Sequence, residues 1–470
     1  MSRMPLADVR WLSAFQPRRS DPDLRPLPLG MLGLIVIGAL LLMLPGMTAP
    51  GRTLAWLDAF FVATSAVCVT GLSTVNPGET FSPLGLGVVI ALVQLGGLGI
   101  VTASLALVML SGERLSLAHE GAVAATLGRL QRARPGELFG YSCAVVAVSE
   151  LAGAVVLFVR LCEVNPTADP GELAWVAVFH AVSAFCNAGF STFPEGLVRW
   201  RDDPWLLGAV DLLVFAGGIG LMALVSLRYF HFWRRDPRQR GQLALQTKLA
   251  LAVSLLLVLA GLGATLLFEW NRAFAAEPWS QKISLAAFHS FMRTAGFTAT
   301  DLAEMHPATL LFSLGLMFIG GSPGSMAGGI KTVTFAILFC TARAALLRQE
   351  NVQIFGRRLD PRISAIALMI MLLALAGTTA GIAALMITEI GQPASATSHH
   401  WLGLAFEAVS AFGTVGFSTG VTPLLTPGGK IVIMILMFVG RVGPLMLAVY
   451  LVRPVKPWRV RFPEEDVALG

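Results

Sequence analysis

The stretch Gly413-Thr414-Val415-Gly416-Phe417-Ser418 decides the fold, because the chain carries three similar stretches upstream of it. Each places a glycine before an apolar residue and a serine or threonine, and each follows a short apolar segment. The three are Cys68-Val69-Thr70-Gly71-Leu72-Ser73, Cys186-Asn187-Ala188-Gly189-Phe190-Ser191 and Arg293-Thr294-Ala295-Gly296-Phe297-Thr298. A pattern that recurs at similar intervals in an apolar chain predicts a symmetric, internally repeated membrane architecture.

The composition excludes a large soluble core. The 470 residues are 55% hydrophobic and 13% charged, whereas a soluble protein carries about 25% charged residues. Apolar runs of about 20 residues recur along the chain, which is long enough to cross a hydrocarbon core. The five cysteines are scattered and show neither metal-ligand nor disulfide spacing.

Around each glycine loop the chain follows one order: an apolar span, a shorter apolar segment, the loop and a second span. We therefore expect an all-α polytopic membrane protein with four pseudo-symmetric repeats around a central pore. Each repeat is helix, pore helix, filter loop and helix, which gives eight full crossings. The second span of the second repeat is expected at 204–230. The predicted parts are a retained N-terminal tail at 1–27, repeats at 28–110, 138–232, 244–347 and 362–453, a loop at 111–137 and a C-terminal tail at 454–470.

The distribution of basic residues predicts the orientation. Most of the 34 Lys and Arg lie in the tails and in the loops 111–137, 228–248 and 343–362, and few, Arg293 among them, lie on the opposite side. The positive-inside rule then places both termini in the cytoplasm, and the glycine loops enter from outside. The acidic outer face either enriches cations at the mouth or is only a solvated rim. The dense basic segment 228–240 fits lipid headgroups or a docked protein.

The glycine loops have the chemistry of a cation filter. Backbone carbonyls at membrane depth are tolerated where they are paired or line a water-filled path, and inward carbonyls can replace the hydration shell of an alkali cation. Glycine supplies the unusual dihedral angles, and the C-terminal end of the preceding half-helix favours a cation. A single loop would be read as an ordinary re-entrant bend, but four in matching contexts favour a filter. The predicted ion-binding residues are Val69, Thr70, Gly71, Asn187, Ala188, Gly189, Thr294, Ala295, Gly296, Thr414, Val415 and Gly416.

The second span of the third repeat is interrupted. Gly320–Gly329 contains five glycines and a proline, which cannot hold a regular helix. Non-helical backbone at this depth must line a cavity, so the segment is predicted to be an intramembrane loop that moves or, alternatively, a flexible hinge between helices. Lys331 at its end is either a gate charge or a side chain that snorkels to the cytoplasm.

The second spans also align on a residue pair: Gly96-Gly97, Gly217-Gly218, Gly320-Gly321 and Gly440-Arg441. A charge at mid-membrane is expensive and by default functional, so Arg441 is expected near the axis, where it opposes ion passage and pairs with gate-loop carbonyls. A structural salt bridge is the alternative. The predicted gate residues are Gly320, Gly321, Ser322, Pro323, Gly324, Ser325, Gly328, Gly329, Lys331 and Arg441.

Four further polar residues lie within apolar segments. Asp211 is a candidate partner in a polar network, and Glu150 is less informative. His180 and Glu407 lie on the short segments before their loops and are expected to hydrogen bond the filter backbone.

Several motifs resemble the Trk/Ktr/HKT superfamily of potassium transporters, most closely its bacterial Ktr type, over about residues 28–453. These motifs are Ser65–Leu72, Arg293–Phe297, Gly320–Thr332 and Gly440–Pro444. The resemblance implies potassium uptake in a bacterial cell membrane, a gating role for the Gly320–Gly329 loop, a homodimer and a cytoplasmic ring of nucleotide-binding regulatory subunits of the RCK/KTN type. All four filter glycines are present, whereas some plant relatives have serine in the first loop and favour sodium. Phe291-Met292 departs from the family, which has a proline nearby.

A sodium or other monovalent-cation transporter of the same build remains open, and an intramembrane enzyme is a weaker alternative. No catalytic constellation occurs in the sequence. The expected ion is transported K⁺, with Na⁺ as a candidate activator and no organic cofactor in the chain. Because no phosphate-cradling glycine loop is present, nucleotides are expected to act through a partner; membrane lipids are expected partners, and nucleic acids are not.

Overall fold

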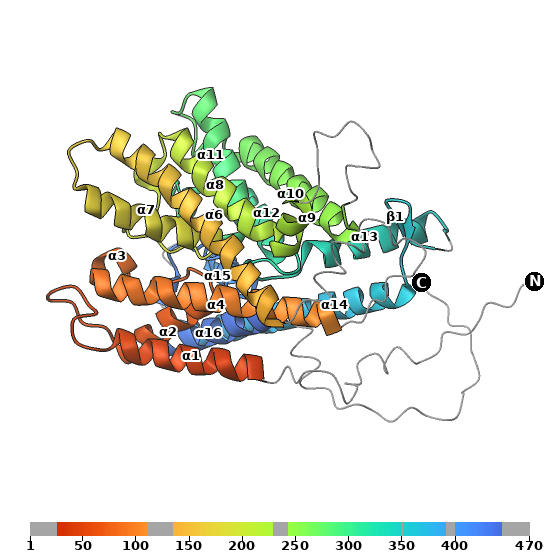
Figure 1. Ribbon diagram of the computed structural model, residues 1–470, viewed down its shortest axis with the longest axis horizontal. Coiled ribbons are helices and arrows are strands. Elements are labelled where there is room, and N and C mark those ends of the chain that lie inside the picture. The colour runs from red at the N-terminus through yellow and green to blue at the C-terminus, as the bar shows by residue number, and fades with distance from the viewer. Residues whose placement is uncertain (1–25, 111–134, 229–242, 350, 392–399, 444–470) are drawn as a thin grey trace, which may run out of the picture.

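The computed structural model describes residues 26–110, 135–228, 243–349, 351–391 and 400–443. Nearly all of them lie in helices, which run roughly side by side along the long axis of the molecule (Figure 1). The strands found in these ranges are β1 (Gln353–Ile354) and β2 (Arg357–Arg358), which pair antiparallel. The expected all-α class is confirmed. The predicted tails and almost all of the predicted basic loops 111–137 and 228–240 lie outside the described residues.

The helices follow one order four times: a first helix, a shorter helix that ends at a glycine loop, and a third helix. The first set is α1 (Pro26–Leu42), α2 (Trp56–Val67) and α4 (Pro83–Leu110), and the second is α6 (Pro135–Val164), α7 (Pro170–Phe185) and α8 (Pro204–Ile219) with α9 (Leu221–Arg228). The third is α10 (Leu245–Glu269), α11 (Trp279–Phe291) and α12 (Pro307–Phe318) with α13 (Thr332–Leu346), and the fourth is α14 (Pro361–Thr388), α15 (His400–Gly413) and α16 (Pro427–Val442). Short turns in the connections are α3 (Pro77–Thr80), η3 (Val198–Trp200), η4 (Met292–Thr294), η5 (Leu302–Glu304) and η7 (Thr422–Leu424).

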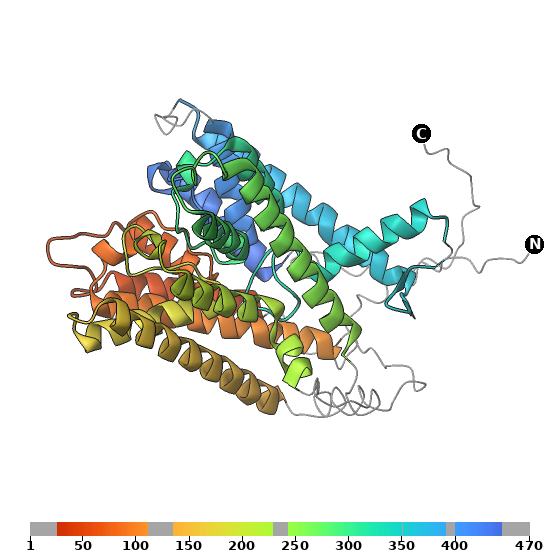
Figure 2. The same cartoon turned by 90° about the horizontal axis from the view of Figure 1, so that it is seen from above.

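The four sets are packed in cyclic order. Helix α4 packs against α6 and α7, α8 against α11, α12 against α15, and α16 against α2. Figure 2 shows the sets as neighbouring bundles. Because the fourth set returns to the first, the ends of the shorter helices are brought to the middle of the molecule.

Local sequence explains where the third helices begin. Proline occupies the first turn of α8, α12 and α16, where its missing N–H is not needed. The residue before each proline caps the helix through its side chain: Asp203 accepts from Trp205 and Leu206, His306 from Ala308, and Thr426 from Gly429.

One contact recurs within every set. A leucine of the third helix packs into a glycine of the first helix, where an added β-carbon would lie under 3 Å from the leucine side chain. The pairs, with the distance from that β-carbon position to the nearest leucine δ-carbon, are Gly38–Leu92 (2.6 Å), Gly153–Leu213 (2.6 Å), Gly261–Leu316 (2.9 Å) and Gly381–Leu436 (2.6 Å). Each pair lets the two helices approach closely, so the sets share one internal geometry.

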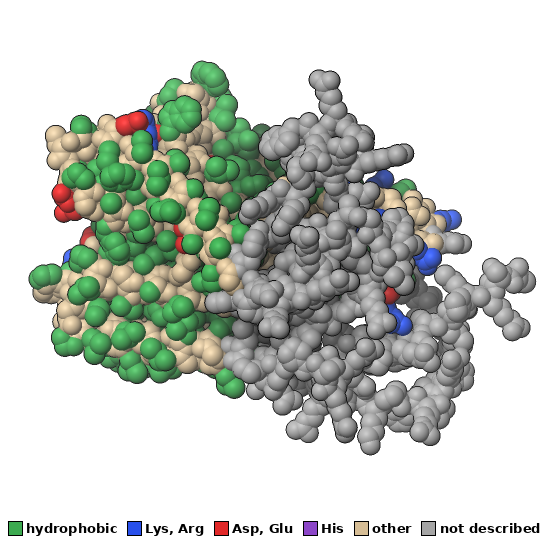
Figure 3. Space-filling view, viewed as in Figure 1, with side chains coloured by type: hydrophobic (Ala, Val, Ile, Leu, Met, Phe, Trp, Pro, Cys, Tyr) green, Lys and Arg blue, Asp and Glu red, His purple; other side chains and the backbone are tan. Residues whose placement is uncertain are grey.

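The outer surface is apolar. Among the described residues, three helices are long and apolar enough to cross a membrane: α6 over Ser142–Val164, α10 and α14. Seven shorter apolar helical stretches, of 10–17 residues, were found in the other described helices. In Figure 3 hydrophobic side chains cover the helical body, acidic side chains lie mostly at the left-hand end, and Lys and Arg gather at the right-hand end near the α13–α14 connection. This surface is suited to lipid.

Candidate functional site

The four glycine loops form a closed ring. A β-carbon placed on Gly71 would lie 2.2 Å from the carbonyl oxygen of Ala188, in the loop of the next set. The same relation joins Gly189 to Ala295 (2.2 Å), Gly296 to Val415 (2.3 Å) and Gly416 to Thr70 (2.3 Å). Each glycine therefore lies against the carbonyl group that precedes the next glycine around the ring. Any side chain at these four positions would collide with neighbouring backbone.

The backbone of three loops alternates between left-handed and ordinary conformations. Val69 and Gly71 have φ of 55° and 92°, and Thr414 and Gly416 have φ of 47° and 99°. Asn187 and Gly189 repeat the pattern at 59° and 68°. A β-branched residue at positive φ is a strained outlier, and such strain is concentrated at functional sites. The third loop differs, because Gly296 (φ 71°) follows the 3₁₀ turn Met292–Thr294.

A serine precedes the filter glycine by six residues in every loop, which the sequence interpretation did not use. Its hydroxyl accepts the N–H of the glycine in two loops: Gly71 to Ser65 at 3.0 Å and Gly416 to Ser410 at 3.1 Å. In the other loops Ser183 donates to the carbonyl of Phe190 (2.8 Å), and Ser290 donates to that of Val258 on α10 (2.6 Å). The constant spacing was the signal that could have identified these residues.

The side chains two residues before the glycines are unequal. Thr294 donates to the Asn187 side-chain oxygen (2.9 Å), which ties the second loop to the third. The Asn187 amide also donates to the carbonyls of Phe185 (3.1 Å) and Val214 (3.2 Å). Val69 has no polar atom to offer at the equivalent position. The ring therefore repeats one contact between glycine and carbonyl group in all four loops, whereas its side chains are asymmetric.

His180 and Glu407 brace the segments that follow two of the glycines. Glu407 accepts from the Thr419 backbone N–H (3.0 Å) and the Ser418 hydroxyl (2.7 Å), both beyond the loop glycine Gly416. His180 bonds the Ser191 hydroxyl (3.0 Å) and the Val176 carbonyl of its own helix (2.8 Å). The predicted hydrogen bond to the filter backbone itself is therefore made by neither residue, and each instead holds the segment that follows its loop glycine.

A loop between α12 and α13 lies buried among all four sets. Its two ends pair with each other, because Gly320 N–H donates to Ile330 (2.8 Å) and Ile330 N–H donates to Phe318 (3.2 Å). The backbone of Ser322 and Met326 donates to Gly218 (2.9 Å) and Gly217 (3.1 Å) of α8. The segment 320–331 is thus an ordered, non-helical loop, which we call the central loop. It is not a bent helix.

The central loop also contacts the point at which the third helix of the second set is interrupted. A span was expected at 204–230, but the helix divides into α8 and α9 at Gly220, which has φ 86°. Leu221 N–H donates to the carbonyl of Gly324 (3.1 Å) instead of continuing the helical ladder. A β-carbon at Gly220 would lie 2.9 Å from the carbonyl oxygen of Pro323, so glycine is required by both the turn and the contact.

Three cationic side chains donate to carbonyls of the central loop. Arg441 bonds Met326, Lys331 bonds Ala327 (2.7 Å), and Arg293 bonds Ile319 (2.6 Å) and Gly320 (3.3 Å). No ion pair joins Arg441 to a carboxylate in the described ranges, and its Nε and second terminal nitrogen have no hydrogen-bond partner there. Lys331 folds onto its own loop. Arg293, which was expected on the outer side, is only 5% exposed, so that assignment was wrong.

The aligned residue pairs surround this loop. Gly97 faces Met326, with 3.1 Å from the site of an added β-carbon to the sulfur, and Gly218 bonds Ser322. Arg441 completes the layer from the fourth set. The preceding glycines of three sets lie against carbonyls at the ends of the shorter helices: Gly96 on Val67, Gly217 on Phe185 and Gly440 on Phe412.

Two buried acids behave differently from each other. Glu150 accepts from Gln94 (3.1 Å), and both contact the Cys186 thiol at the start of the second loop. Glu150 is therefore more informative than the sequence suggested. Asp211 was expected to have a partner, but its Oδ1 is buried without a hydrogen-bond partner among the described residues.

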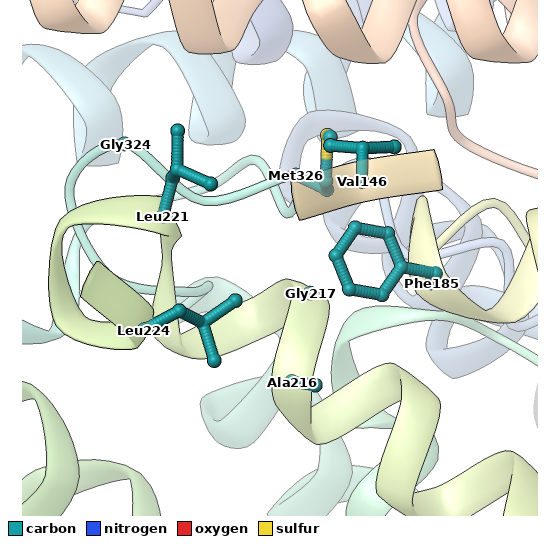
Figure 4. Close-up of a pocket in the computed structure, with 8 residues that line it drawn as sticks. All are labelled: Val146, Phe185, Ala216, Gly217, Leu221, Leu224, Gly324 and Met326. Carbon is teal, nitrogen blue, oxygen red and sulfur yellow. The ribbon is translucent and has the colours of Figure 1, made fainter. Parts of the chain in front are cut away.

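A small cavity lies between α6, α8, α9 and the central loop. Figure 4 shows apolar side chains around it, with Gly217 on one side and Gly324 and Met326 of the central loop on the other. Its volume is about 10 Å³, room for about one water molecule. The contact between the central loop and α8 therefore leaves a small gap beside its backbone hydrogen bonds.

The chain is similar in sequence and fold to known cation transport proteins. The model of the TrkH family, described as a cation transport protein, matches residues 12–456. The Ktr system potassium uptake protein B of Bacillus subtilis (strain 168) is 34% identical over 94% of this chain and 96% of that protein. The potassium/sodium uptake protein NtpJ of Enterococcus hirae is 32% identical over 94% of this chain and 96% of its own length. The potassium transporter TrkH from Vibrio parahaemolyticus shares the fold, with a TM-score of 0.71 at 17% identity over 93% of this chain and 86% of its own.

Proposed function

The chain belongs to the TrkH family of cation transport proteins, and we propose that it is the pore-forming membrane subunit of a potassium-uptake system. Its relatives are transporters, so the chain is not an enzyme and the catalytic alternative is discarded. Four repeats surround one pore and provide eight crossings. The two halves of α8–α9 and of α12–α13 each count as one interrupted crossing in this proposal.

One observation carries the proposal: the cyclic contact of the four filter glycines with the carbonyl groups of the next loop. Carbonyl oxygens from Thr70, Ala188, Ala295 and Val415 lie on successive members of the ring. Oxygen ligands of this kind can replace the water of an alkali cation. With only one shared glycine per loop the stack of carbonyl rings is short, so we expect weaker discrimination than in a tetrameric potassium channel. K⁺ is the transported ion, and the twelve filter residues predicted from the sequence are its ligands.

The central loop is the proposed gate. It lies directly against the filter, since a β-carbon at Gly328 would lie 3.1 Å from the carbonyl oxygen of Gly413. Arg441 holds the loop through Met326, and Lys331 holds it through Ala327. Both positive charges repel a cation below the filter, and both stabilise the central loop in a position that blocks the ion path. Opening requires the loop to leave the hydrogen bonds that it makes with Gly217 and Gly218.

The regulatory arrangement is proposed from the family. A homodimer in the bacterial cell membrane, with cytoplasmic termini, docks on a cytoplasmic ring of nucleotide-binding subunits. The basic residues of the α13–α14 connection, Arg348 and Arg358 among them, are exposed at the end of the molecule where such a ring or lipid headgroups would bind. Sodium is the candidate activator, and the name of the Enterococcus relative, a potassium/sodium uptake protein, keeps sodium open as a second transported ion.

Growth rescue tests the proposal. The chain is expressed in a bacterium that lacks potassium uptake, with and without a regulatory subunit, and growth is followed at low potassium. Growth that increases with added K⁺, and not with added Na⁺ in its place, is the expected result. Entry of Na⁺ in preference to K⁺ into the same cells would favour the sodium transporter of the same build. Failure in both strains, with the protein present in the membrane, would contradict the proposal.

A further inference from the structure

Arg293 links the filter to the central loop. It precedes the third filter residues Thr294 and Ala295 directly, and its side chain is 5% exposed. The guanidinium donates to two successive carbonyls, those of Ile319 at 2.6 Å and Gly320 at 3.3 Å. A charged donor shared by two carbonyls makes a stronger contact than a neutral hydrogen bond. Arg293 is thus bonded covalently to the third filter loop and hydrogen bonded to the beginning of the central loop.

The two carbonyls need this donor because of where α12 ends. The helix stops at Phe318, and carbonyls at a helix C-terminus have no partner within the helix. A cation at that end also interacts favourably with the helix dipole. Ile319 and Gly320 in turn pair with Ile330 at the far end of the loop. Arg293 therefore anchors the beginning of the central loop, and the backbone pairing with Ile330 holds the far end to that beginning.

A second contact joins the loop to the filter. A β-carbon on Gly328 would lie 2.1 Å from the hydroxyl oxygen of Thr414, in the fourth filter loop. That hydroxyl is fully buried and makes no hydrogen bond with the described residues. The end of the central loop therefore rests on the fourth filter loop, while its beginning is tied to the third.

The third filter loop is also the one that departs from the common backbone. In the other three loops the residue two before the glycine has positive φ, whereas here Met292–Thr294 forms a 3₁₀ turn. Both Ala295 and Gly296 donate their N–H to Met292 (3.0 and 2.8 Å). The equivalent position to Arg293 in the other loops is Cys68, Cys186 or Gly413, none of which can reach as far. The charged residue and the altered turn occur in the same loop.

We infer that Arg293 is a positioning residue that couples the central loop to the third filter loop, so that the position of the gate alters the ion selectivity of the filter. The inference rests on the proposed potassium pore and adds a function to a residue outside its predicted filter and gate. A residue that only capped α12 would affect stability and would leave selectivity unchanged. Measurements of stability and of ion selectivity therefore distinguish the two roles of Arg293.

The experiment uses the purified full-length chain in lipid vesicles, with K⁺ and Na⁺ fluxes measured separately. Arg293→Met removes the donors and keeps an apolar chain of similar length, and Arg293→Lys keeps a charge without the fork of donors. Arg441→Met is the matched comparison, because Arg441 contacts the central loop from α16 and belongs to no filter loop. Each variant is also made with residues 322–327 deleted, which gives a double-mutant cycle.

Arg293→Met is expected to lower the ratio of K⁺ to Na⁺ flux on the order of tenfold, the size of one lost charge-assisted hydrogen bond. Arg293→Lys should lower it less. Arg441→Met should raise flux and change the ratio less than Arg293→Met does, because it leaves the bonds between Arg293 and the loop in place. In the deletion background, Arg293→Met should have no further effect, because the loop through which it acts is already altered.

An unchanged ratio in Arg293→Met with measurable flux would overturn the inference, as would additive effects in the cycle. If Arg293→Met does not fold, Arg293→Lys decides by the same criteria; if neither variant reaches the membrane, Arg293 is a folding residue and the inference fails. Failure of the proposed function looks different, because the unmodified protein would then carry no K⁺ flux at all.

Discussion

The ring of glycine loops and the layer beneath it are built from the same four sets of helices, yet they differ in symmetry. In the ring, every set supplies one glycine and one carbonyl in the same relation to its neighbour. In the layer beneath, three sets supply Gly-Gly, the fourth supplies Gly440-Arg441, and the third is interrupted by the central loop. Equal ligands suit the selection of a spherical ion, whereas a gate needs one part that moves and one that holds it.

The same contrast occurs along the third helices. Each aligned pair is followed, three residues after its first member, by a residue able to end a helix: Gly99, Gly220, Pro323 or Gly443. Helix α4 continues through Gly99, whereas α8 ends before Gly220, where the central loop takes over its hydrogen bond. A glycine at this position therefore either continues the helix or ends it, and at Gly220 the contact with the central loop accompanies the end of the helix.

The largest effect is expected from breaking the ring. Gly189→Ala would place a β-carbon about 2.2 Å from the carbonyl oxygen of Ala295 and force a side chain into a left-handed conformation. Strain of about 3 kcal/mol corresponds to a loss of K⁺ flux of roughly a hundredfold. Flux into vesicles measures it. Gly263→Ala is the control, since this α10 glycine has no atom within 4 Å of an added β-carbon; equal losses in both variants would remove the argument from the ring contact.

Shortening the central loop should increase the K⁺ flux, whereas the substitution in the ring should reduce it. Deletion of residues 322–327 removes the segment that bonds Gly217 and Gly218 and lies over the cavity of Figure 4. Flux without the regulatory subunit should rise about tenfold, as expected if a barrier of roughly 1.4 kcal/mol is lost. The same measurement with the regulator present should show a smaller increase. Unchanged flux in a well-folded deletion would end the gating role of the central loop.

Arg441→Ala should weaken the same barrier less, because Lys331 and Arg293 still hold the loop. Basal flux is expected to rise about threefold to fivefold, which corresponds to roughly 1 kcal/mol and to one net hydrogen bond. Arg343→Ala, on the exposed side of α13, is the matched control. An inactive protein with lowered thermal stability would instead point to a structural role for Arg441.

The sequence allowed much of this organisation to be predicted. Four glycine loops, their short helices and the interruption after Ile319 follow from local composition and glycine spacing, and local signals of this kind survive in the folded chain. Arg441 was found because a charge in an apolar span is rare. Its hydrogen bond to the Met326 carbonyl of the central loop is present, and its role in gating stays a prediction.

Tertiary contacts set the limits of that prediction. The break at Gly220 depends on Gly324, about a hundred residues away, and no local pattern encodes that contact. Arg293 was assigned to the outer side because it lies beside a loop, although its side chain turns inward to the end of α12. Asp211 was expected in a polar network, but its Oδ1 has no hydrogen-bond partner among the described residues. The group that decides the first case lies in another set of helices, and the group that decides the second lies at the end of a helix in the same set.

The smallest predicted effect concerns the serine that precedes each filter glycine by six residues. Ser410→Ala removes the acceptor of the Gly416 N–H, which lies 3.1 Å away, and should lower the K⁺ to Na⁺ ratio about twofold for a loss of roughly 0.5 kcal/mol. Ser183→Ala is the comparison, because its hydroxyl donates to Phe190, beyond the filter glycine. A weaker effect on the ratio is expected there, with similar thermal stability in both variants. If Ser183→Ala changed selectivity as much as Ser410→Ala, the serines would act by shaping the whole loop, and the ring would owe its geometry to the helix ends and not to the bond at each glycine.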